Sequence, residues 1–285
     1  MPQKLFSIVA TLAVFATVVG APAEESGRDG LVQLVAQVQK ADYEGDRAAL
    51  LRLHGQLEPF LENKQLVSRV QYWRGFALWR RALNGFNESE DPRELQTDLQ
   101  QAVKDFNESS FVDAKFADAK IGAGSCLSNL MFLNRGNAAR MKELIAQSSA
   151  ILNEVKTEAV DNPRLYWVLG ANVWYAPPEH GEGQAAAIAM YKKGLDLIQN
   201  NKTRSIDPLE PSWGEPELLM NLAWSNLHKS TPDPAAAQSY ATSALKLVPY
   251  WHYVKDILLP QIQRAVDSNQ ASRICSRKPS AWQTI

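Results

Sequence analysis

Apolar residues recur every three to four positions through nearly all of this 285-residue chain. That spacing places them on one face of an α-helix. We find no stretch in which apolar and polar residues alternate between two turn signals, which is the pattern typical of a half-buried strand. The sequence therefore predicts an all-α protein.

Glycine, proline and capping residues divide this pattern into about eleven helices. Three of the starts pair a capping side chain with a proline in the first turn, namely Asp91-Pro92, Asn162-Pro163 and Asp233-Pro234. The expected helices span 28–42, 46–59, 66–84, 91–106, 112–134, 137–159, 163–175, 184–200, 215–229, 233–247 and 250–268.

Two stretches of the second half are similar to each other. They read NPRLYWVLGANVWYAPPEHGEGQAAAIAMYKKGLDLIQ from Asn162 and PELLMNLAWSNLHKSTPDPAAAQSYATSALKLVPYW from Pro216. In the first helix of each, a leucine precedes a small residue, and in the second helix two small residues lie seven apart: Leu169-Gly170 with Ala187 and Gly194, and Leu222-Ala223 with Ala237 and Ala244. In these features both stretches resemble tetratricopeptide repeats, in which small residues let two helices approach closely.

A weaker copy covers 68–107, and its register has two alternatives. With Gly75 at the small position, Arg74 takes a core position, whereas core positions for Trp73, Phe76 and Ala77 turn Arg80 inward. Between 112 and 159 we see a helical pair without the motif. The resemblance implies a right-handed solenoid of stacked antiparallel helical hairpins over 24–270.

The start of the chain predicts export. An uncharged run from Leu5 to Val19 is shorter than the roughly 20 residues that span a membrane, and Ala21-Pro22-Ala23 after it is a small-x-small cleavage site. We expect residues 1–23 to be a Sec-type signal peptide and the protein to be periplasmic or extracellular. The mature chain has no further candidate span, and 271–285 is expected to form a polar tail.

Charge and motifs exclude several functions. Lys and Arg number 30 against 31 Asp and Glu, with no basic cluster, so we expect no nucleic-acid partner. The four histidines are scattered, and no metal or nucleotide motif occurs, so we expect no metal, no cofactor and no enzyme. The run Glu179-His180-Gly181-Glu182 could chelate a cation, but it also suits a flexible connector between two helices.

The two cysteines, Cys126 and Cys275, allow a single pairing. An oxidising compartment would permit a disulfide that fastens the C-terminal tail to the helix around Cys126. The alternative is a small buried Cys126 and a free Cys275. Because the two are not in C-x-x-C spacing, we do not expect a redox function.

Eight Trp and eight Tyr stand out, many of them in the first helices of the repeat-like hairpins. In the tetratricopeptide family, ligand-facing positions lie three before, one after and four after the small residue, and Arg164 falls one turn earlier on the same face. The resemblance thus implies a concave groove lined by Tyr72, Phe76, Trp79, Arg164, Trp167, Ala171, Trp174, Met220, Trp224 and Leu227. The alternative is that these rings belong to the core, or that a terminal helix such as 250–268 covers them.

The hypothesis that follows is an exported scaffold, resembling the tetratricopeptide family, that binds a protein or peptide in this aromatic groove. The alternative is a solute-binding component that holds a small molecule or oligosaccharide on the same surface.

Overall fold

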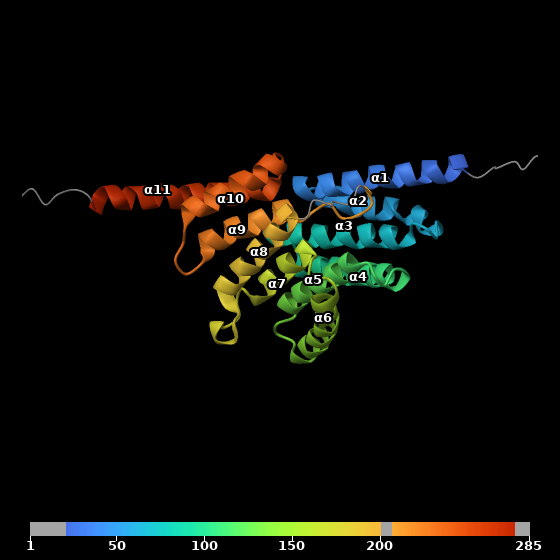
Figure 1. Cartoon of the computed structure of the whole chain (residues 1–285), viewed down its shortest axis with the longest axis horizontal. Helices are drawn as coiled ribbons and strands as arrows, with labels where there is room; N and C mark the ends of the chain where they lie inside the picture. The colour runs from blue at the N-terminus through green and yellow to red at the C-terminus, as the bar shows by residue number, and fades with distance from the viewer. Residues whose placement is uncertain (1–20, 201–206, 277–285) are drawn as a thin grey trace, which may run out of the picture.

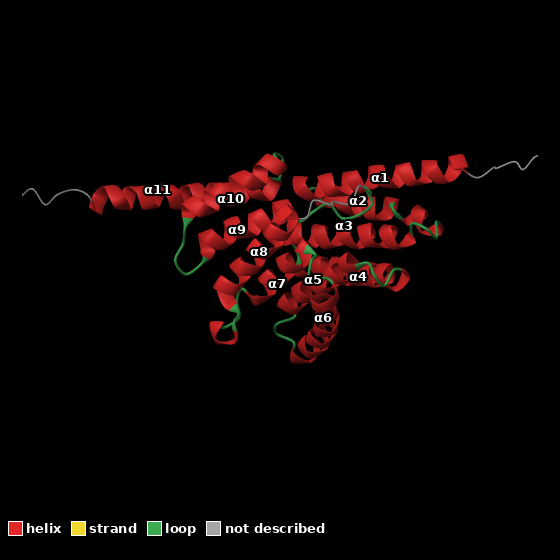
Figure 2. Ribbon diagram, viewed as in Figure 1, coloured by secondary structure: helices red, strands yellow, loops and turns green. Residues whose placement is uncertain are grey.

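The computed structural model describes residues 21–200 and 207–276 of the chain (Figure 1). Within these ranges every regular element is a helix, as Figure 2 shows, so the all-α prediction is confirmed. The elements are α1 (Ala21–Glu44), α2 (Arg47–Gln56), η1 (Glu58–Glu62), α3 (Val67–Glu88), α4 (Pro92–Val112), α5 (Ala117–Leu133), α6 (Ala138–Glu158), α7 (Pro163–Val173), η2 (Pro178–His180), α8 (Gly183–Asn200), α9 (Glu215–His228), α10 (Pro234–Leu247), η3 (Tyr253–Leu258) and α11 (Leu259–Ser276).

The main departure from the expected helices lies near the C-terminus. A single helix was expected over 250–268, but the chain forms the π-helix η3 before α11 begins at Leu259. Pro260 has no N–H to donate to the preceding turn, and the wider turn of η3 lies directly before it. The sequence pattern marks the apolar positions but does not distinguish an α-turn from a π-turn.

Contacts between consecutive helices run along two stretches of the chain, one from α1 to α6 and one from α7 onward. Each helix from α1 to α5 packs against the next one along the chain, and α7 packs on α8, α8 on α9 and α9 on α10. In addition, α1, α3, α5 and α7 each contact the next odd-numbered helix. This arrangement is consistent with stacked hairpins (Figure 1). The right-handed handedness and the tetratricopeptide assignment stay predictions.

Small residues stand where helices approach closely. A Cβ added at Gly170 of α7 would lie 2.3 Å from Tyr191 of α8, and one at Gly75 of α3 would lie 3.1 Å from Phe106 of α4. These are two positions that the repeat resemblance assigns to small residues. Arg80 nevertheless also turns inward and is 4% exposed, so features of both registers considered for α3 occur together.

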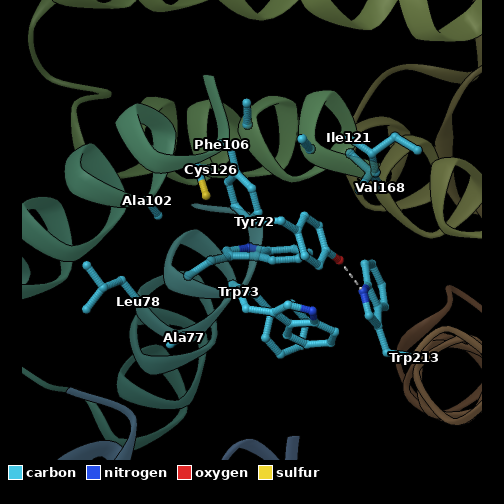
Figure 3. Close-up of a cluster of buried hydrophobic side chains, with 14 of the residues drawn as sticks. Tyr72, Trp73, Ala77, Leu78, Ala102, Phe106, Ile121, Cys126, Val168 and Trp213 are labelled. Carbon is cyan, nitrogen blue, oxygen red and sulfur yellow. Dashed lines mark hydrogen bonds between the residues drawn. The ribbon is translucent and has the colours of Figure 1, made fainter. Parts of the chain in front are cut away.

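The hydrophobic core has its centre at α3. Tyr72, Trp73, Phe76 and Trp79 are all fully buried, and they belong to a cluster that runs from α1 to α9 (Figure 3). A smaller cluster joins α9, α10, η3 and α11. The helix α3 is therefore buried on all sides rather than on one stripe.

Only part of each chain end lies within the described residues. Of the predicted signal peptide, all but 21–23 lies outside the described residues, and those three residues belong to α1. Among the described helices, none combines the length and apolar character that crossing a membrane requires. Cys126 is fully buried in the core, while the side chain of Cys275 lies outside the described part and α11 projects away from the bundle (Figure 1). Their pairing stays a prediction.

Candidate functional site

Three of the predicted groove residues, Tyr72, Phe76 and Trp79, have no exposed surface. A segment from the second half of the chain packs on their side of α3. We call residues 207–214, the described part of the connection between α8 and α9, the closing segment. The cover that the sequence suggests is a terminal helix such as 250–268, whereas the structure places this connection there.

Trp213 of the closing segment occupies the centre of this contact. Its ring centroid lies 6.1 Å from that of Phe76, 5.4 Å from Trp79 and 5.8 Å from Trp167. Its indole N–H donates a hydrogen bond of 2.8 Å to the hydroxyl of Tyr72 (Figure 3). The aromatic face predicted on α3 is thus filled by the chain itself.

Charged side chains fasten the closing segment at its edges. Arg69 donates to Glu210 at 2.7 Å, and Arg164 donates to the carbonyl of Trp213 at 3.2 Å. Arg164 also pairs with Asp118 at 2.9 Å, and although burial opposes its charged form, Asp118 raises the pKa of Arg164. Arg164, predicted at the edge of an open groove, instead holds the segment that closes it.

A cavity of about 330 Å³ lies beside this filled face. Each helix that lines it is odd-numbered (α1, α3, α5, α7 and α9), and residues at the start of η3 complete the wall. Six aromatic side chains contribute, namely Phe86, Phe132, Trp167, Trp224, Trp251 and Tyr253, together with four carboxamides, Asn84, Asn87, Asn129 and Asn221. Flat apolar surface and neutral hydrogen-bonding groups dominate this lining.

Three of the predicted residues, Trp167, Met220 and Trp224, line this cavity together. Trp174 does not line it, but its ring packs edge-on against that of Trp224, with the two centroids 5.1 Å apart. Leu227 is half-buried and packs on the smaller core cluster. The structure therefore divides the predicted set between the core on α3 and a cavity around α9.

The charged residues of the cavity form one buried cluster. Arg80 donates to Asp42 at 2.7 Å and lies 3.5 Å from a carboxylate oxygen of Glu217. Burial opposes the charge of Arg80, but Asp42 and Glu217 together raise its pKa. Burial also raises the pKa of Glu217, which accepts a hydrogen bond of 2.9 Å from the hydroxyl of Tyr43. The cluster ties α1, α3 and α9 together beside the cavity.

Sequence reasoning missed the outer wall of the cavity. Phe132 is the penultimate residue of α5, a segment in which no repeat motif was recognised. Trp251 is the last residue of the second repeat-like stretch, outside its recognised motif, and Tyr253 follows it. The only available signal was their aromatic character, since no spacing relates residues so far apart in the chain. For the Glu179–Glu182 run, His180 has no described side chain, and the described residues hold no group of three His, Cys, Asp or Glu side chains suited to a metal ion.

Fold and cavity together define an all-α protein with an aromatic-lined cavity of small-molecule size. No protein-family model and no curated protein sequence matches the chain. Among solved structures, the chain is similar to the HusA haemophore from Porphyromonas gingivalis, with a TM-score of 0.54 and 16% sequence identity. That likeness covers 75% of this chain and 100% of the haemophore chain, and it shows a shared helical fold.

Proposed function

We propose that this protein binds a flat, largely apolar small molecule in the aromatic-lined cavity, and that haem is the first ligand to test. The observation that carries the proposal is the lining itself, since six aromatic side chains from α3, α5, α7, α9 and the start of η3 line about 330 Å³. Aromatic faces stack on flat conjugated ligands and exclude water from them. The fold likeness to a haemophore directs the choice of haem.

The lining suits a macrocycle. Trp167, Trp224 and Trp251 offer ring surface for stacking, and the Met220 thioether is a donor of a kind that holds haem iron. Tyr253 is a poorer candidate for the iron, because burial raises the pKa of its phenol and so favours the protonated form. When bound, the group would supply iron and a chromophore, and the chain supplies the apolar surroundings.

The closing segment favours a small molecule over the extended peptide of the leading sequence hypothesis. A peptide groove along the odd-numbered helices would need the rings of α3 on its surface, but Trp213 packs against Phe76 and Trp79 there. The proposal is for binding without catalysis. Export to the periplasm or the extracellular space, expected from residues 1–23, is part of the same proposal.

Titration of haem into the purified protein, followed by the Soret band and by quenching of tryptophan fluorescence, tests the proposal. We expect saturable binding of one molecule per chain in this cavity. Tryptophan fluorescence should be quenched because Trp167, Trp224 and Trp251 line the cavity. Metal-free protoporphyrin, titrated in parallel, separates binding of the macrocycle from binding of the iron.

Two exposed phenylalanines provide a matched pair of variants. Phe132 is 58% exposed and lines the cavity, whereas Phe111 is 90% exposed at the end of α4 and does not. Phe132→Ala should weaken haem binding about fivefold, the loss of one aromatic contact, and Phe111→Ala should leave it unchanged. Absence of saturable binding, or an equal loss in both variants, would overturn the proposal.

A further inference from the structure

The exposed side of the cavity lies where the end of α3 meets the end of α5. Asn87 and Phe132 line the cavity and are exposed, whereas the other lining residues are buried or half-buried. Asn87 directly follows Phe86, whose ring centroid lies 6.0 Å from that of Phe132, so the two exposed residues belong to neighbouring surfaces. We call Asn87 and Phe132 the cavity mouth.

An arginine side chain lies against the mouth. The guanidinium carbon of Arg135, in the turn after α5, lies 4.7 Å from the ring centroid of Phe132. Arg135 also donates a hydrogen bond of 3.1 Å from Nη1 to the carbonyl oxygen of Phe132. A guanidinium is attracted to the face of an aromatic ring. Two contacts with one residue therefore hold this positive charge beside the cavity mouth.

The charge of Arg135 is available to a ligand. Arg135 pairs with no carboxylate in the described part of the chain. Other arginines nearby do have such partners, since Arg80 pairs with Asp42 at 2.7 Å and Arg140 with Glu143 at 2.8 Å. A guanidinium carries five N–H donors in a planar fork that matches a carboxylate. An acidic group on a bound molecule is therefore a suitable partner for Arg135.

The interior of the cavity does not suit an acidic group. Asp42 and Arg80 are the charged residues of the lining, and both are buried. Arg80 already faces two carboxylates, Asp42 at 2.7 Å and Glu217 at 3.5 Å. A ligand carboxylate inside would be a third anion beside one guanidinium, and burial of a charge without a counter-charge is costly. An acidic edge of the ligand therefore belongs at the mouth.

We infer that Arg135 is a specificity-determining residue, which pairs at the cavity mouth with a carboxylate on the outer edge of the ligand. The inference rests on the proposed function and specifies the ligand class, a flat apolar molecule with one acidic edge. The apolar body lies among the tryptophans, and the carboxamide of Asn87 offers a further N–H donor to the acidic edge.

Two metal-free porphyrins that differ only in charge test the inference. Deuteroporphyrin carries two propionic acid groups, and its dimethyl ester carries two uncharged esters in their place. Fluorescence quenching in the same dilute neutral detergent gives the affinity of the purified protein for each, and the ratio of the two affinities is the quantity compared. Salt screens an exposed ion pair, so the preference for the diacid should decrease as NaCl rises from about 0.02 M to about 0.5 M.

Three substitutions assign the preference to Arg135. Arg135→Gln removes the charge at an exposed position, so the ratio of diacid to ester affinity should fall about threefold to fivefold, the effect of an exposed ion pair. Arg135→Lys keeps the charge and should retain most of the preference. Arg52→Gln removes an equal charge from an exposed residue of α2 that does not line the cavity, and the ratio should stay unchanged. Thermal unfolding establishes that all three variants are folded.

The outcomes separate the inference from the proposed function. If neither porphyrin binds the wild type, the proposed function fails and the inference falls with it. If both bind but the ratio is the same in the wild type and in Arg135→Gln, the proposed function stands and the role of Arg135 is wrong. A ratio that does not respond to salt also overturns that role, and so does an equal fall in Arg52→Gln, which would assign the preference to the overall charge of the protein.

Discussion

The hydroxyl of Tyr72 accepts a hydrogen bond of 2.8 Å from the indole N–H of Trp213, across 141 positions of the chain. A second bond of the same kind lies beside it, since Trp73 donates to the carbonyl of Leu209 at 2.8 Å. Tyr72, Trp73 and Trp213 are at most 3% exposed. The closing segment therefore contributes Leu209 and Trp213 to the hydrophobic core.

Replacement of Trp213 should destabilise the whole fold. Trp213→Ala leaves a cavity beside Phe76 and Trp79 and leaves the Tyr72 hydroxyl without its partner, so we expect the free energy of unfolding to fall by about 3–5 kcal/mol. The neighbouring Ser212→Ala changes an exposed residue and should stay within about 0.5 kcal/mol of the wild type. Urea denaturation monitored by circular dichroism measures both values. Similar stabilities for the two variants would show that the closing segment does not support the core.

The contact between α7 and α8 offers a test of the hairpin packing. Gly170→Ala places a Cβ 2.3 Å from the ring of Tyr191, which is 3% exposed and has little room to move, so we expect a loss of about 1–3 kcal/mol. Gly136→Ala serves as the control because nothing lies within 4 Å of its added Cβ. Thermal unfolding of the two variants compares them, and equal midpoints would contradict the close approach at Gly170.

The helices could be predicted because their signals are local. Asn162, expected as a cap, accepts a hydrogen bond from the backbone N–H of Arg164 at 3.0 Å, and Asp233 does the same for Ala236 at 3.0 Å. Both caps lie within three residues of the groups they satisfy, so a short window of sequence contains the whole interaction. The periodic apolar positions add the direction of each buried face.

The candidate site could be predicted only in part, because its assembly depends on distant segments. The repeat pattern identifies the face of α3 that holds Tyr72 and Phe76, but it does not reveal that Trp213 fills that face. The closing segment has no helical periodicity, and the sequence around Trp213 does not indicate which rings its indole packs against. Around α9, where no such segment intervenes, Met220 and Trp224 do line a cavity.

The buried carboxyl of Glu217, beside the cavity, should make the stability of the fold depend on pH. Glu217 is fully buried, accepts a hydrogen bond of 2.7 Å from the N–H of Gly214, and faces Arg80, Asp42 and the hydroxyl of Tyr43. Burial raises the pKa of Glu217 above its ordinary value of 4.5, and the charge of Asp42 acts in the same direction, while Arg80 opposes them. The folded chain therefore holds a proton on Glu217 at pH values where the unfolded chain has released it.

The raised pKa of Glu217 should lower the free energy of unfolding as the pH rises. Because the folded-state pKa is raised, the contribution of Glu217 to stability is fully present below pH 4.5 and is lost as the pH rises through the raised value. Glu217→Gln has no proton to lose, so the free energy of unfolding of the wild type minus that of this variant should decrease as the pH rises from about 4 to about 7. Urea denaturation across this range measures the difference, and Glu182→Gln, at an exposed position, should show no such trend. A difference that is flat or grows with pH would mean that Arg80 outweighs burial and holds Glu217 ionised in the folded protein.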